Sequence, residues 1–88
     1  PVLNVIADTR GTESYLDFAA YRSATEVMTA HGITRLNLVV CERDAARQFV
    51  VRFGNEVAQL GGLTVHSRIV ADIDAAPAVL AQLIAEPD

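Results

Sequence analysis

The sequence predicts an α/β domain in which three strands and three helices alternate in the order βαβαβα. Three short runs of mostly apolar and β-branched residues have the length and composition of strands. Each run is followed by a longer stretch with apolar residues three and four positions apart, which is typical of an amphipathic helix. Strands joined by helices pair in parallel through right-handed crossovers, so this order predicts a three-stranded, mainly parallel sheet. The 88 residues leave room for one small domain, residues 1–88.

The first strand is predicted over Pro1–Ala7 and the first helix over Glu13–Ala30. Thr12 is a suitable N-cap, because its side-chain oxygen can accept a hydrogen bond from the first helical turn. Gly32 follows the helix and can adopt the left-handed conformation that commonly ends one. The apolar positions of this helix are Leu16, Ala20, Ala24, Val27 and Met28.

The second strand is predicted over Thr34–Cys41, and Asp44 is predicted to cap a covering helix that ends at Leu60. An alternative is a strand over Gln48–Phe53 that ends in a turn at Gly54–Asn55, because a glycine inside a helix costs about 1 kcal/mol relative to alanine. The regular three-and-four spacing favours the helix. Its apolar stripe comprises Ala46, Phe49, Val50, Phe53, Val57 and Leu60, and its polar face mostly Arg47, Arg52, Asn55, Glu56 and Gln59.

The third strand is predicted over Leu63–Ile73, after the double glycine that stops the preceding helix. Asp74 is predicted to cap the last helix, and Pro77 falls in its first turn, where a missing N–H does no harm. The predicted buried stripe of this helix consists of Val79, Leu80, Leu83 and Ile84.

Apolar and polar residues alternate along the second and third strands. Parallel strands that are covered on both faces are continuously apolar instead. The alternation therefore predicts that the helices lie largely on one face of the sheet. The opposite face carries Asn37, His66 and Arg68, and we expect it to be open to water or covered by a partner or by a further part of a longer chain.

The composition excludes several classes of function. Seven arginines and eleven acidic residues give a net charge of −4, which argues against nucleic acid, because binding phosphates needs a clustered basic face. No apolar run approaches the roughly 18 residues of a membrane span, and no secretory signal is recognisable. Cys41 is the only cysteine, so a disulfide framework is excluded and a cytoplasmic location is expected.

The sequence also lacks the residues of a metal or cofactor site. His31 and His66 lie far apart in the chain, and with Cys41 they do not supply the three or four converging ligands that a metal needs. A phosphate-binding glycine loop is absent, because Gly61–Gly62 follows a helix rather than opening one. A role for Cys41 as a nucleophile is disfavoured, since a small buried cysteine is the commoner case. We therefore expect neither metal nor cofactor.

Three segments carry a resemblance to a known family: NVIADTRG, RLNLVV with the helix AARQFVVRFGNEVAQLGG, and VHSRIVADIDAAPAVLAQL. Together they resemble the bacterial SpoIIAA-like, or STAS-like, domains. The matching residues are Asp8, Arg10 and Gly11 in the first loop, Leu38–Val40 in the second strand, and Ala78, Leu80 and Leu83 in the last helix. The resemblance implies a non-enzymatic regulatory or protein–protein interaction module without a cofactor.

The chain departs from that family in two ways. The β-hairpin that usually opens the family would precede Pro1, so the resemblance implies a version without the hairpin or a domain excised from a longer protein. The phosphorylatable Asp-Ser-Ser-Gly loop of the anti-sigma-factor antagonists is absent. Thr9, Thr12 and Ser14 lie in the comparable strand-to-helix region, and the sequence does not decide whether one of them is modified.

The binding site is expected on the half-polar sheet face or at the carboxyl ends of the strands, where open α/β sheets gather their ligands. The candidate binding residues are Asp8, Arg10, Thr12, Glu42 and Arg43 at that edge, and His66 and Arg68 on the polar sheet face. The edge is predominantly acidic and disfavours an anionic ligand. We expect the partner to be another protein or a neighbouring domain, and homo-oligomerisation stays open.

An enzymatic alternative starts from Pro1. A proline followed by a strand, an arginine and a helix resembles the tautomerase superfamily up to about Cys41, where that family continues with a hairpin. This resemblance implies Pro1 as general base, with Arg10 and Arg35 as anchors for a substrate carboxylate. A third interpretation is an interaction domain cut from a larger protein, its open sheet face covered by a neighbour. The binding module is favoured over the enzyme.

Overall fold

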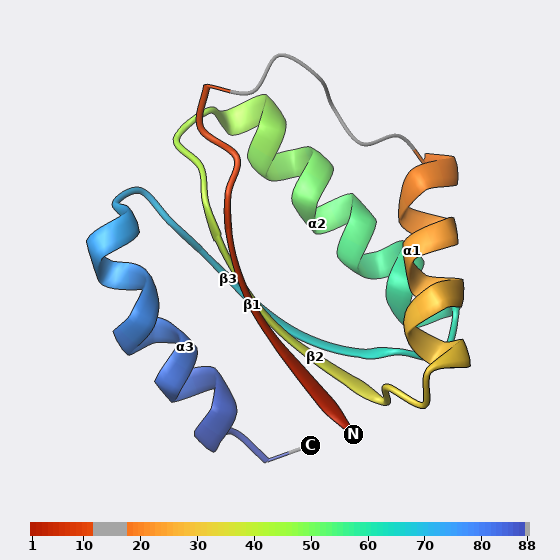
Figure 1. Cartoon of the computed structure of the whole chain (residues 1–88). Coiled ribbons are helices and arrows are strands. Elements are labelled where there is room, and N and C mark those ends of the chain that lie inside the picture. The colour runs from red at the N-terminus through yellow and green to blue at the C-terminus, as the bar shows by residue number, and fades with distance from the viewer. Residues whose placement is uncertain (12–17, 88) are drawn as a thin grey trace.

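The computed structural model describes residues 1–11 and 18–87 and has the predicted alternation of strands and helices (Figure 1). The elements are β1 (Val2–Asp8), α1 (Phe18–Ala30), β2 (Arg35–Cys41), α2 (Ala45–Leu60), β3 (Thr64–Val70), a 3₁₀ turn (Ile73–Ala75) and α3 (Ala76–Ala85). The predicted α/β fold is therefore confirmed. Thr12, Ser14 and the predicted start of the first helix lie outside the described residues.

The three strands form one parallel sheet in the order β1-β2-β3. Leu36 of β2 pairs with Leu3 of β1 and with Val65 of β3, and the register runs without interruption to Cys41. β2 is the central strand and is buried along nearly its whole length, whereas β1 and β3 are the two edges.

Helices cover both faces of the sheet, and Figure 1 shows α1 and α2 on one side and α3 on the other. One core cluster joins Leu36 to Ala58 of α2, and a second joins Val39 to Ala76 and Leu83 of α3. Two helices thus share a face as predicted. The expectation that the polar face is open or covered from outside the domain is wrong, because α3 folds back onto that face.

Gly54, the residue that argues against the predicted second helix, is required by the packing of α1 on α2. A Cβ atom built on Gly54 would lie 2.2 Å from a ring carbon of Tyr21, so only glycine leaves room for the tyrosine ring where α1 packs on α2. Burial by this packing raises the pKa of the Tyr21 hydroxyl. The helix is also capped as predicted, since the Asp44 carboxylate accepts a 2.9 Å hydrogen bond from the Arg47 amide. The alternative of a strand over residues 48–53 is wrong.

The predicted apolar stripe of α2 faces the core only in part. Phe49 is 67% exposed and Leu60 is 89% exposed. Within the predicted stripe only Val57 is buried, and the other buried residues of the helix are Val51, Gly54 and Ala58. Both sets have helical spacing, and the set with the smaller residues lets α2 approach its neighbours closely.

The last part of the chain differs from its prediction at the ends of the elements. β3 ends at Val70 rather than at Ile73. The predicted cap Asp74 is wrong, because the Asp72 side chain instead accepts a hydrogen bond from the Asp74 amide and starts the 3₁₀ turn. Pro77 does lie in the first turn of α3. Leu83 is fully buried as predicted, whereas Ile84 is half exposed.

Candidate functional site

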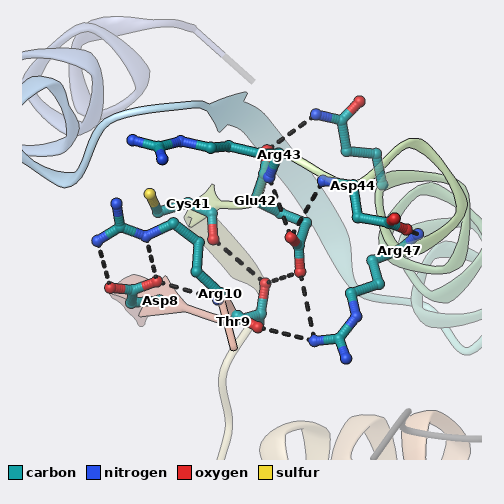
Figure 2. Close-up of polar contacts among 9 residues, drawn as sticks. Asp8, Thr9, Arg10, Cys41, Glu42, Arg43, Asp44 and Arg47 are labelled. Carbon is teal, nitrogen blue, oxygen red and sulfur yellow. Dashed lines mark hydrogen bonds and ion pairs between the residues drawn. The ribbon is translucent and has the colours of Figure 1, made fainter. Parts of the chain in front are cut away.

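The carboxyl ends of the three strands are held together by hydrogen bonds around Thr9 and Glu42 (Figure 2). The Thr9 amide donates to the Cys41 carbonyl over 3.2 Å, and the Glu42 amide donates to the Val70 carbonyl over 2.9 Å. The Thr9 hydroxyl lies 3.2 Å from the Cys41 carbonyl and 2.9 Å from Glu42 Oε1, and can donate to either. These contacts make one continuous edge from segments that are far apart in the sequence.

Glu42 is the buried centre of this edge, only 3% exposed. Its Oε2 accepts from the amides of Arg43 and Asp44 at 3.0 and 3.2 Å. Its Oε1 accepts from Thr9 and lies 3.8 Å from Arg47 Nη1. Burial by itself would raise the pKa of the Glu42 carboxyl, but these donors and the charge of Arg47 outweigh it, so the pKa lies below its ordinary value.

Asp8 and Arg10 form a second, more exposed unit. Arg10 Nε donates to Asp8 Oδ1 at 2.9 Å and Nη2 to Oδ2 at 2.8 Å, a two-pronged ion pair. The Arg10 amide also donates to Oδ1 at 3.1 Å. The hydrogen bonds from the Arg10 side chain and amide lower the pKa of Asp8 to about 2, so this carboxylate is charged at neutral pH.

Two more arginines connect the three chain segments that form this edge, residues 8–10, 42–47 and 71–74. Arg43 Nε donates to the Ala71 carbonyl at 2.9 Å, and Arg47 Nη1 donates to the Thr9 carbonyl at 3.0 Å. Gln48 Nε2 donates to the Glu42 carbonyl at 2.9 Å. In Figure 2 the side chains of Arg10 and Arg43 extend to the same side of the edge.

Arg47 and Gln48 were missed by the sequence reasoning, which placed Arg47 on the polar outer face. A signal for them existed, because the first turn of a helix that follows a parallel strand lies at the carboxyl edge of the sheet. Thr9, whose modification the sequence leaves undecided, is half-buried, and its hydroxyl can donate to Glu42 within the edge.

The other two predicted binding residues lie elsewhere. His66 and Arg68 are on the sheet face that α3 covers, and both contact Glu86, which follows that helix. His66 Nδ1 lies 2.9 Å from Glu86 Oε2. This hydrogen bond is the main reason why the pKa of Glu86 lies below its ordinary value. The structure therefore brings together Asp8, Arg10, Glu42 and Arg43, and it separates His66 and Arg68 from them.

The residues of the tautomerase alternative lie at opposite ends of the sheet. The Pro1 carbonyl accepts from the Thr34 amide at the start of β2, whereas Arg10 follows the far end of β1. Arg35 is 7% exposed and donates to the carbonyls of Leu83 and Glu86 at 2.6 and 2.8 Å. It therefore closes the carboxyl end of α3, the arrangement in which a cation suits a helix.

The described residues contain no group of three or more His, Cys, Asp or Glu side chains that could hold a metal ion. Every buried side-chain nitrogen or oxygen in the described part of the chain has a hydrogen-bond partner. The Cys41 thiol is free and fully buried. Across residues 1–11 and 18–87, no helix is both long and apolar enough to cross a membrane.

Comparison with family models, curated proteins and solved structures found no match to this chain. The resemblance to STAS-like domains therefore stays a prediction from the residues quoted above.

Proposed function

We propose that this chain is a non-catalytic interaction module that binds a partner protein or a neighbouring domain through the carboxyl edge of its sheet. The observation that carries the proposal is the convergence of charged residues from three segments, 8–10, 42–47 and 71–74, on one surface. Such an edge is where open α/β sheets present their binding residues. The regulatory role implied by the STAS-like resemblance belongs to the same proposal.

The state of the ionisable groups supports binding rather than catalysis. A general acid or base works best with a pKa near the operating pH. The pKa of Asp8 is lowered to about 2 and that of Glu42 is lowered as well, and both carboxylates already accept several hydrogen bonds. These groups act as fixed charges that hold the edge in shape. The tautomerase alternative gains no support, since Arg10 lies far from Pro1 and Arg35 is bound to α3.

The chemistry of the edge indicates the kind of partner. Arg43, Asp44, Asp72 and Asp74 are exposed, and carboxylates outnumber arginines among them. A small anion would meet this negative charge at close range, whereas a protein surface with its own mixed charges can pair with both signs. Exposed charges at the rim of such an interface mainly guide association and set specificity.

A photo-crosslinking residue placed at Arg43 tests the proposal in cells that make the chain naturally. Arg52 is the matched control, because it is an exposed arginine on α2 that takes no part in the edge. We expect a discrete protein adduct from position 43 and none from position 52, and we expect Asp74→Lys to weaken the adduct. Equal adducts from both positions, or none from position 43, would overturn the proposal. Far-ultraviolet circular dichroism verifies that each variant is folded.

A further inference from the structure

The outer side of β1 is an unpaired sheet edge. Among residues 1–11 and 18–87, β1 pairs only with β2, and Figure 1 shows β1 passing in front of the other strands with no described helix across it. The Pro1 carbonyl and the Thr9 amide both bond toward β2. Because main-chain groups alternate in direction along a strand, the N–H and C=O groups of Val2, Asn4 and Ile6 point outward.

This edge lacks the devices that usually prevent strand pairing. Val2–Asp8 contains no proline and no lysine, and its register with β2 has no bulge. Its one charge is that of Asp8 at the end of the strand, which Arg10 neutralises. Val2 and Ile6 are 54% and 39% exposed on the same face, so the edge presents apolar side chains beside its free hydrogen-bonding groups.

The edge is also complementary to itself. Asn4 lies midway between Val2 and Ile6, and all three share one face and the outward main-chain direction. In an antiparallel pair centred on Asn4, Val2 of one chain lies opposite Ile6 of the other. Leu3 likewise lies opposite Val5 on the other face. Antiparallel residues that face each other outward exchange two hydrogen bonds per pair, so this register satisfies all three outward residues on both chains.

Neighbouring registers fit less well. A centre at Leu3 or at Val5 sets Asn4 opposite an apolar side chain, and the centre at Val5 also brings Asp8 opposite Val2. With the centre at Asn4, each Asp8 falls beyond Val2 of the other chain, so the two like charges stay apart.

We propose that β1 pairs in antiparallel orientation with β1 of a second copy of this chain, with the two-fold axis beside Asn4. The two sheets then form one continuous sheet in the order 3-2-1-1-2-3, with both α3 helices on the same face. The carboxyl edges lie at opposite ends of this assembly and stay accessible. The pairing does not depend on the function proposed for those edges.

Two double variants with matched exposure test the register. In Val2→Lys/Ile6→Lys the paired positions carry like charges, and in Val2→Lys/Ile6→Glu each lysine meets a glutamate of the other copy. We expect the wild-type mass from sedimentation equilibrium at low salt to rise with concentration toward that of two chains. We expect the first variant to stay at one chain and the second to regain the larger mass. Both substituted side chains are well exposed, and circular dichroism verifies folding.

A wild-type chain with the mass of one copy at every concentration would overturn the proposal and leave the edge to a strand of another protein. Dimers that persist in Val2→Lys/Ile6→Lys would place the interface elsewhere. If both variants stay at one chain while the wild type dimerises, the register centred on Asn4 is wrong.

Discussion

Arg35 illustrates how one buried charge joins distant parts of this molecule. Its Nε donates to Asn37 Oδ1 at 2.8 Å, and Asn37 in turn donates to Asn4 Oδ1 at 2.9 Å. The terminal nitrogens hold the carbonyls at the end of α3. A buried charge is tolerated only where its hydrogen bonds are made. The polar residues of this sheet face therefore serve to pair the buried Arg35 guanidinium, and no ligand is needed to explain them.

At the exposed edge, the charge of Asp8 depends on Arg10. The folded pKa of about 2 lies below the ordinary value of 3.8. A lowered carboxyl pKa stabilises the fold above the ordinary value, and this contribution is lost as pH falls toward 2. We expect Arg10→Ala to return the pKa of Asp8 toward 3.8 and to reduce the loss of stability between those two pH values. An NMR titration of the Asp8 carboxyl carbon measures the shift.

The control for that titration is Arg22→Ala. Arg22 forms an exposed ion pair with Glu26 on α1 at 3.4 Å and does not contact Asp8. The pKa of Asp8 is expected to stay near 2 in this variant. A similar shift in both variants would mean that the net charge of the protein, rather than the contact with Arg10, sets the pKa.

At the scale of elements, the contact between α1 and α2 depends on Gly54. We expect Gly54→Ala to lower the free energy of unfolding by about 1–3 kcal/mol, because the added methyl group overlaps the Tyr21 ring. In a Tyr21→Ala background the overlap is gone, and the same substitution should stabilise the helix by about 1 kcal/mol. Urea unfolding of the wild type, the two single variants and the double variant measures both effects. A loss of the same size in both backgrounds would contradict the packing explanation.

The elements could be predicted from the sequence, but the orientation of α2 could not. Periodicity, Asp44 and the double glycine suffice to define that helix. Two stripes of it have helical spacing, however, and the phenylalanines are the more hydrophobic choice. The buried stripe is the one whose small residues admit Tyr21, and that fit depends on a residue about thirty positions away.

Some residues of the candidate site could likewise be predicted from the sequence, and others could not. Asp8, Arg10, Glu42 and Arg43 could be predicted to meet, because the carboxyl ends of parallel strands share one edge. Arg47 could be placed at the same edge because it lies in the first turn of α2, but its contacts there depend on the rotation of the helix, which the sequence does not show. His66 and Arg68 were grouped with the site only because the crossing of α3 to the second face was not foreseen, and no local spacing signals that crossing.

At the scale of the whole molecule, three layers share a small core, and Leu83 is the largest fully buried residue of the layer formed by α3. This residue is fully buried against Val39 and Ala76, whereas Leu60 at the end of α2 is 89% exposed. We expect Leu83→Ala to lower the free energy of unfolding by about 2–5 kcal/mol and Leu60→Ala to change it by less than about 0.5 kcal/mol. Urea unfolding of both variants makes the comparison, with the same atoms removed in each.

The comparison decides whether α3 is part of the cooperative fold. We expect the Leu83→Ala substitution to loosen the end of α3 on the sheet, and the Arg35 guanidinium then loses its carbonyl partners there. The loss should therefore appear in a single transition that also reports on β2. Equal, small effects of the two substitutions, or a separate early transition for α3, would mean that the sheet folds without its second layer and that the polar face is open part of the time.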